Sequence, residues 1–320
     1  MGARASATGS SSRPPPRNSD NGRVETPDAL QVTLPSPLVV LDDERLLRHG
    51  VRLLLKRDDL IHPDLPGNKY RKLHLNLRAA AEAGHRALLT FGGAYSNHLR
   101  ATAAAGRLLG LRTVGVVRGD ELAGRPLNPS LARATADGMR LHFLDRPTYR
   151  RKAEPEVLAA LLDRLGPAYV IPEGGSNALA ARGCAALGRE LRGSADIAAV
   201  ACGTGGTLAG LAAGLGPGQR AIGFPVLKGG AFLAEDVLRL QREAFGGRRG
   251  DWRLDDRFHG GGYARSTPEL DAFGADFAAR HGLAPEPVYV AKMLYGVFTA
   301  ATEGAFAPGT TVAAVVTGAR

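Results

Sequence analysis

The chain has 320 residues, of which 44% are apolar and 22% are charged, so most of it should form a globular core. Aromatic residues make up only 6%, which argues against a stacking surface for single-stranded nucleic acid, and no apolar run approaches the roughly 18 to 20 residues of a membrane span. The net charge is +10, but the basic residues are spread over many segments, which favours a solvated basic surface over a nucleic-acid site.

The first thirty residues and the cysteines bear on the location of the protein. Residues 1–30 are rich in Ser, Pro, Gly and Arg, and we expect them to form a disordered extension. The start also fits a short myristoylation pattern and faintly resembles a transit peptide, although both patterns often occur by chance. Cys184 and Cys202 are too few for a disulfide framework, and we expect both to be buried in a cytoplasmic protein.

From about residue 31 onward, short β-branched runs alternate with helical patterns, which predicts parallel crossovers and an α/β fold. Strands are expected at 51–55, 86–91, 113–117, 139–144, 169–171, 197–202, 220–226 and 311–316. Helices are expected at 68–83, 97–109, 129–137, 155–165, 177–191, 207–215, 230–245, 267–280 and 292–303. In such open sheets a site forms where strands end and helices begin. Three of these junctions carry chemically informative residues.

The clearest junction is Gly203-Thr204-Gly205-Gly206-Thr207, between a strand and a helix. Glycines let the backbone approach an anion, and the free N–H groups at the helix start bind phosphate. Leu208 breaks the dinucleotide pattern, and the nucleotide P-loop pattern is also absent. The segment therefore predicts a phosphate cradle without a nucleotide signature; a plain tight turn is the alternative.

The second junction is Gly67-Asn68-Lys69-Tyr70-Arg71-Lys72-Leu73, which places Lys69 in the first turn of a helix and Lys72 one turn later on the same face. A partly desolvated lysine there suits covalent amine chemistry, whereas the alternative is a basic surface cluster.

The third junction is Gly92-Gly93-Ala94-Tyr95-Ser96-Asn97-His98. Ser96 and Asn97 are typical helix caps, and the N–H groups beside them can hold a carboxylate. The alternative is that Ser96 is only a cap and His98 a satisfied polar side chain.

Together these motifs resemble fold-type II pyridoxal-phosphate enzymes, specifically the 1-aminocyclopropane-1-carboxylate deaminase and D-cysteine desulfhydrase family. The resemblance runs from about residue 35 to the C-terminus. Further similar segments are Pro172–Asn177, Gly261–Ala264, Pro287–Tyr289 and Thr317-Gly318. The resemblance implies two α/β domains with open, mostly parallel sheets and flanking helices: a large cofactor-binding domain of 31–85 plus 173–320, and a small domain of 86–172. It also implies a homodimer.

The resemblance further implies a role for each candidate residue. Lys69 would hold pyridoxal phosphate covalently and later remove the substrate's α-proton. Ser96 would bind the carboxylate of a small amino-acid substrate and take part in catalysis, and His98 would support the Ser96–Asn97 turn. Tyr289 and Tyr263 would transfer protons or stabilise a leaving thiolate, unless they are core residues. The cofactor contacts would come from Lys72, Asn97, Gly203, Thr204, Gly205, Gly206, Thr207 and Thr317. We expect no metal site, nucleic-acid partner or membrane partner.

Two departures from the family pattern bear on the substrate. Val290 and Ala291 stand where the family has Thr or Glu followed by Gly, and the chain ends shortly after Thr317. In the family, ring-opening deaminases carry a glutamate after the tyrosine and a leucine at the position of Thr317. A hydroxyl beside the ring nitrogen makes a weaker electron sink, which suffices for β-elimination. We therefore expect D-cysteine to give pyruvate, ammonia and hydrogen sulfide. The alternatives are 1-aminocyclopropane-1-carboxylate deamination and a catalytically impaired cofactor-binding relative.

Overall fold

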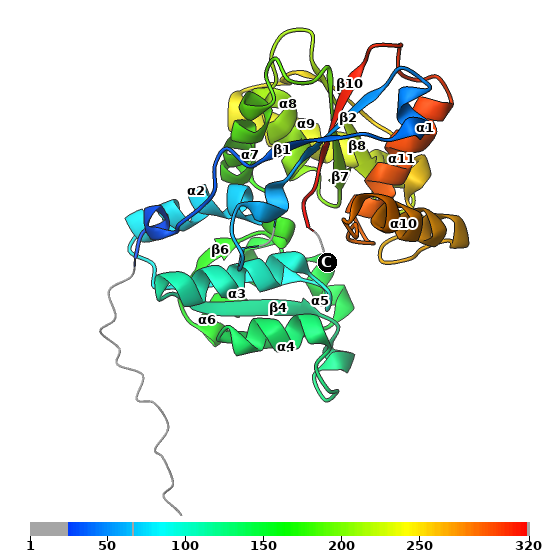
Figure 1. Ribbon diagram of the computed structural model, residues 1–320. Coiled ribbons are helices and arrows are strands. Elements are labelled where there is room, and N and C mark those ends of the chain that lie inside the picture. The colour runs from blue at the N-terminus through cyan, green and yellow to red at the C-terminus, as the bar shows by residue number, and fades with distance from the viewer. Residues whose placement is uncertain (1–24, 66, 319–320) are drawn as a thin grey trace, which may run out of the picture.

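The computed structural model describes residues 25–65 and 67–318 and contains two open sheets (Figure 1). The larger sheet has the order β1-β2-β10-β7-β8-β9 and the smaller one the order β5-β4-β3-β6. All neighbouring strands are parallel except β1 and β2, which confirms the predicted α/β class with mostly parallel sheets. The strands are β1 (Leu38–Leu41), β2 (Arg52–Lys56), β3 (Ala87–Gly92), β4 (Arg112–Arg118), β5 (Met139–Leu144), β6 (Tyr169–Ile171), β7 (Ile197–Cys202), β8 (Arg220–Pro225), β9 (Asp251–Leu254) and β10 (Thr311–Val315).

Helices cover both faces of each sheet, as parallel crossovers require. Figure 1 shows α3, α4 and α6 around the smaller sheet, while α7, α8 and α9 lie on the opposite side of the larger sheet from α10 and α11. The helices are α1 (Glu44–Leu47), α2 (Lys69–Glu82), α3 (Asn97–Leu109), α4 (Pro129–Ala136), α5 (Arg146–Arg150), α6 (Pro155–Leu165), α7 (Ala178–Glu190), α8 (Gly206–Gly214), α9 (Leu233–Phe245), α10 (Pro268–His281) and α11 (Val290–Thr302).

The central strands are buried runs that the sequence identifies well. All residues of β3 and β7 are buried, which is typical of parallel strands covered on both faces. Two apolar clusters fill the space above and below the larger sheet, and three smaller clusters surround the smaller one. The strands of the smaller sheet all lie between residues 87 and 171, although the division of the chain into two domains stays a prediction.

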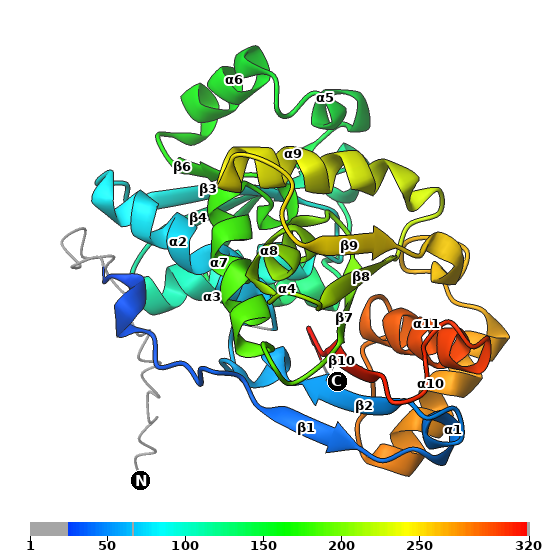
Figure 2. The ribbon, with the colours of Figure 1, turned by 90° about the horizontal axis from the view of Figure 1, so that it is seen from above.

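The structure differs from the predicted elements near the start of the chain and at the edges of the larger sheet. Residues 25–30 do not belong to a disordered extension, because Pro27 and Leu30 are buried and the Glu25 amide donates to the carbonyl of Leu109 at 3.1 Å. The rest of the predicted extension lies outside the described residues. The edge strands β1 and β9 were not predicted, and Figure 2 shows them at the two margins of the larger sheet.

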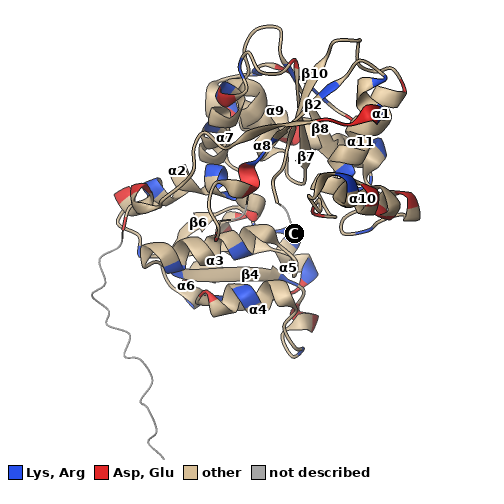
Figure 3. Ribbon diagram, viewed as in Figure 1, with Lys and Arg blue, Asp and Glu red and all other residues tan. Residues whose placement is uncertain are grey.

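Charged residues of both signs are interspersed over the helices of both sheets (Figure 3). Within residues 25–65 and 67–318, no helix is both long and apolar enough to cross a bilayer.

Candidate active site

Lys69 is the first residue of α2, and its amine is desolvated. Burial lowers the pKa of Lys69 to about 8, and no hydrogen bond or ion pair holds the amine within the described part of the chain. Just before it, the side-chain amide of Asn68 donates to the Thr207 hydroxyl at 2.6 Å, which ties the start of α2 to α8. A lysine amine with a pKa this close to neutrality is unprotonated often enough to act as a nucleophile.

Gly67 brings the C-terminal segment to the start of α2. It has a φ of +59°, and a Cβ placed on it would lie 1.4 Å from the carbonyl oxygen of Thr317. Only glycine fits both the conformation and the space. Thr317, predicted as a cofactor contact, therefore passes directly beside the segment that carries Lys69.

The Gly203–Thr207 segment forms a cradle between β7 and α8. The Lys72 ammonium donates to the Ser176 hydroxyl at 2.7 Å, and the hydroxyls of Ser176 and Thr204 lie 2.6 Å apart. A Cβ on Gly206 would lie 2.7 Å from the Ser176 oxygen and 3.2 Å from the Lys72 nitrogen, so glycine keeps this space open. Three polar groups and the free N–H groups at the start of α8 thus converge, and this donor set suits a phosphate.

The Lys72 ammonium is buried beside this cradle. Burial and then the charge of Lys69 lower the pKa of Lys72 to about 7. A bound phosphate would supply the negative charge that this buried cation lacks, so the residues fit the phosphate group of the predicted cofactor.

Ser96 is the N-cap of α3, as one interpretation of the sequence held. Its hydroxyl oxygen accepts from the Leu99 amide at 3.3 Å, which leaves the hydroxyl proton free to donate. Asn97 begins the helix beside it, and both side chains are partly exposed, so they and the N–H groups of the first turn can meet a substrate carboxylate. His98, the next residue, is buried.

Tyr289 and Tyr263 face each other near the cradle. Their hydroxyl oxygens lie 3.5 Å apart, and a Cβ on Gly203 would lie 3.4 Å from the Tyr289 hydroxyl. Burial raises the pKa of Tyr289 well above its ordinary value, and its hydrogen bond with Tyr263 and the nearby Glu286 carboxylate add to this effect. Tyr289 is therefore a neutral phenol at physiological pH and can donate a proton.

Three residues near the site were not predicted as functional. Glu286 accepts from the Tyr289 amide at 2.8 Å, and its Cβ is 3.9 Å from the position of a Cβ on Gly318. The Lys292 ammonium donates to the carbonyls of His259 at 2.7 Å and Gly262 at 2.8 Å, and so fixes the loop that leads to Tyr263. Ser176, the third, lies in the similar segment Pro172–Asn177, which was the signal that could have identified it.

A large cavity lies elsewhere on the molecule. It has a volume of about 610 Å³ and is lined by Arg52, Arg192 and Gln219 at the amino ends of β7 and β8. Ligands of open α/β sheets bind at the carboxyl ends of the strands, where Lys69 and the Gly203–Thr207 cradle lie. We therefore place the active site at the cradle and not in this cavity.

Comparisons with known proteins agree with this fold. A family model described as "Pyridoxal-phosphate dependent enzyme" matches residues 30–318. The mitochondrial bifunctional D-cysteine desulfhydrase/1-aminocyclopropane-1-carboxylate deaminase of Arabidopsis thaliana is 31% identical over 279 residues, which cover 80% of this chain and 69% of the relative. A D-cysteine desulfhydrase of Klebsiella pneumoniae (strain 342) is 30% identical over 295 residues, covering 85% and 88% of the two chains. A crystal structure described as an ACC deaminase homologue superposes with a TM-score of 0.76 at 28% identity, covering 92% and 91% of the two chains.

The fold and the site thus define a fold-type II enzyme that depends on pyridoxal phosphate. The chain belongs to the 1-aminocyclopropane-1-carboxylate deaminase/D-cysteine desulfhydrase family.

Proposed function

We propose that the protein catalyses β-elimination on a small D-amino acid, with D-cysteine giving pyruvate, ammonia and hydrogen sulfide. The choice of D-cysteine as the substrate rests on the presence of Thr317 and Val290 at their two positions. Thr317 lies beside the start of α2 and offers a neutral hydroxyl, whereas Val290 is completely buried in the apolar core of the larger sheet. No carboxylate follows Tyr289 to keep the ring nitrogen protonated, and the weaker electron sink that results suffices when a thiolate leaves.

Each side chain of the candidate site has a separate role in this reaction. Bound pyridoxal phosphate supplies the electron sink for the bond changes at the substrate's α-carbon. The Ser96 turn holds the substrate carboxylate, and the Lys69 amine removes the α-proton. As that proton leaves, the carbon–sulfur bond breaks, and Tyr289 or Tyr263 donates a proton to the departing thiolate. Water then releases ammonia from the remaining fragment and yields pyruvate.

One observation favours the alternative substrate, 1-aminocyclopropane-1-carboxylate. The Glu286 side chain lies against the C-terminal segment near Gly318, so a carboxylate is present on the Thr317 side of the site after all. A negative charge there would strengthen the electron sink, as ring opening requires. The bifunctional relative from Arabidopsis, by its name, carries out both reactions.

A substrate panel tests the proposal. The purified protein with pyridoxal phosphate is incubated with D-cysteine, L-cysteine, D-serine or 1-aminocyclopropane-1-carboxylate, and sulfide, pyruvate and 2-oxobutanoate are measured. We expect sulfide and pyruvate in equal amounts from D-cysteine, and little 2-oxobutanoate. Efficient 2-oxobutanoate formation without sulfide would overturn the substrate choice. Cofactor binding without any turnover would support the catalytically impaired relative.

We also propose that the protein is a homodimer. The exposed apolar residues Leu38, Val39 and Val40 lie on the edge strand β1, and an unpaired apolar edge strand is typical of a surface that another chain covers. Light scattering at twice the monomer mass is the expected result, and a monomer would contradict it.

The free, buried thiols of Cys184 and Cys202 support the proposal of a cytoplasmic location. Burial raises the pKa of Cys184 to about 11 and that of Cys202 to about 12, so both thiols should be chemically inert. Fractionation of the source cells would check the compartment.

A further inference from the structure

The structure determines which atom is the donor in the hydrogen bond between His98 and Thr90. Its Nε2 atom lies 2.7 Å from the Thr90 hydroxyl, and that hydroxyl donates to the carbonyl of Ile171 at 2.8 Å. A hydroxyl has only one proton to donate, so towards His98 it must accept. The proton of a neutral His98 therefore sits on Nε2.

The other edge of the same ring packs against the loop that follows β6. A Cβ on Gly175 would lie 2.9 Å from Cε1 and 3.2 Å from Nδ1 of His98, and Gly175 has a φ of +64°. On the far side of this loop, a Cβ on Gly174 would lie 2.9 Å from the Thr204 side chain. The loop of Gly174 and Gly175 therefore lies between the imidazole ring of His98 and the Thr204 side chain of the phosphate cradle.

The surroundings keep this ring uncharged. Burial, followed by the charges of Lys69 and Lys72, lowers the pKa of His98 well below its ordinary value. The Nδ1 atom is buried and has no hydrogen-bond partner among the described residues, so a second proton there would find no acceptor. A charged His98 would also add a third cation next to the two lysines.

We propose that His98 is a positioning residue that sets the distance between the carboxylate-binding turn at Ser96 and the phosphate cradle at Thr204, acting as a neutral imidazole with its proton on Nε2. The inference rests on the proposed function, because that function assigns substrate binding to the Ser96 turn. His98 immediately follows Ser96 and Asn97 on α3, and its ring is only 2% exposed. A rigid, buried spacer at this point transmits any change in the loop directly to the turn.

Two substitutions separate this role from simple packing. In His98→Gln the amide nitrogen reaches about as far as Nε2 and can still donate to Thr90, whereas the shorter side chain of His98→Asn cannot. We expect His98→Asn to raise KM for the amino-acid substrate about tenfold or more while kcat changes less, because the turn is misplaced and the chemical groups remain. His98→Gln should restore most of the lost affinity. Equal impairment of both variants, or an unchanged KM in His98→Asn, would overturn the proposal.

A spectroscopic measurement tests the protonation state without relying on activity. The full-length protein is prepared with isotope-labelled histidine, and a long-range proton–nitrogen correlation spectrum is recorded. Among the 8 histidines, the His98 signals are those that disappear in His98→Gln. We expect the pattern of a neutral ring protonated on Nε2 from about pH 6 to 9. A charged ring, or a proton on Nδ1, would refute the inference even if β-elimination is confirmed, and the expected pattern would stand even if the substrate proposal fails.

Discussion

The Lys72 ammonium is a buried cation whose pKa is lowered to about 7 by burial and by the charge of Lys69, from an ordinary value of 10.5. In the unfolded chain this lysine keeps its proton up to the ordinary value. The unfolded state therefore binds more protons between these two pH values, and the stability of the cofactor-free protein should rise with pH across this interval. Burying a charged Lys72 at the cradle therefore lowers the free energy of unfolding of the cofactor-free protein.

The substitution Lys72→Met removes this buried charge and should therefore stabilise the cofactor-free protein. The variant should unfold at a higher temperature than the cofactor-free wild type, with the largest difference at pH of about 7 and below, because methionine fills similar space without charge. Ser176 and Thr204 keep each other as partners at 2.6 Å. The same variant should bind pyridoxal phosphate more weakly. Thermal unfolding over a pH series checks the prediction, and a variant less stable than the wild type at every pH would contradict it.

At the scale of elements, the site depends on the contact between the start of α2 and the segment after β10. A Cβ on Gly67 would lie 1.4 Å from the Thr317 oxygen, whereas one on Gly84, at the other end of α2, meets nothing within 4 Å. Both glycines have positive φ values, +59° and +73°. Comparing alanine substitutions at Gly67 and Gly84 therefore separates the effect of backbone strain from the effect of a clash with Thr317.

Gly67→Ala should abolish the visible absorbance of bound cofactor and lower the unfolding temperature by several degrees. Gly84→Ala should cost only the backbone strain, about 1 kcal/mol, and should keep the absorbance. Similar losses in the two variants would show that the contact with Thr317 is not what matters.

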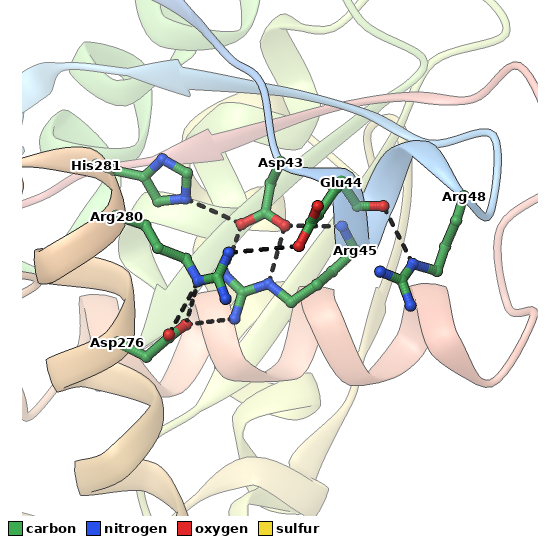
Figure 4. Close-up of polar contacts among 7 residues, drawn as sticks. All are labelled: Asp43, Glu44, Arg45, Arg48, Asp276, Arg280 and His281. Carbon is green, nitrogen blue, oxygen red and sulfur yellow. Dashed lines mark hydrogen bonds and ion pairs between the residues drawn. The ribbon is translucent and has the colours of Figure 1, made fainter.

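A polar cluster joins α1 to α10 at one end of the larger sheet (Figure 4). Asp43 accepts from the Arg45 amide and from its guanidinium, both at 2.9 Å, and lies 2.9 Å from Nε2 of His281. Arg45 also donates to Asp276 of α10 at 2.6 Å. Burial alone would raise the pKa of Asp43, but hydrogen bonds from Arg45 and His281 outweigh it and hold the pKa well below its usual range.

This cluster predicts an acid dependence of stability. Because the pKa of Asp43 is lower in the folded state, its contribution is complete above the ordinary value of 3.8 and is lost as the pH falls below it. Asp43→Asn should be less stable than the wild type near neutrality, and the difference should shrink on acidification below about pH 4. Urea unfolding at several pH values measures this, and a difference that does not depend on pH would argue against it.

In the whole molecule, the residues of the candidate active site lie where the two sheets meet. Lys69 begins α2 and the cradle joins β7 of the larger sheet to α8, whereas Ser96 follows β3 of the smaller sheet. A Cβ on Gly175 would lie 2.9 Å from Cε1 of His98, and one on Gly174 would lie 2.9 Å from the Thr204 side chain, so the start of α3 and the cradle are close together. A change in the relative position of the sheets would therefore change the distance between the substrate carboxylate and the cofactor phosphate.

The sequence predicted the parts of this arrangement that local pattern determines. The strands β3 and β7 were predicted because they are continuous buried runs, and Lys69 was correctly expected in the first turn of a helix. That Lys69 binds the cofactor stays a prediction. The edge strands β1 and β9 have only four residues each and no alternation that marks a buried face, so their pairing depends on the rest of the sheet. Ser176 was not predicted because its hydrogen bond with Lys72 joins residues that are 104 positions apart in the chain. Glu286 lies against the segment at Gly318, and no local sequence motif indicates such a contact.

The most direct test of the candidate active site is to locate the covalently bound cofactor. The protein is loaded with pyridoxal phosphate and reduced with borohydride, and the modified peptide is identified by mass spectrometry. We expect the pyridoxyl group on Lys69, whose amine has a pKa lowered to about 8. We also expect that Lys69→Ala carries no such group and shows no visible absorbance. Modification of Lys72 or of another lysine in place of Lys69 would show that Lys69 does not bind the cofactor.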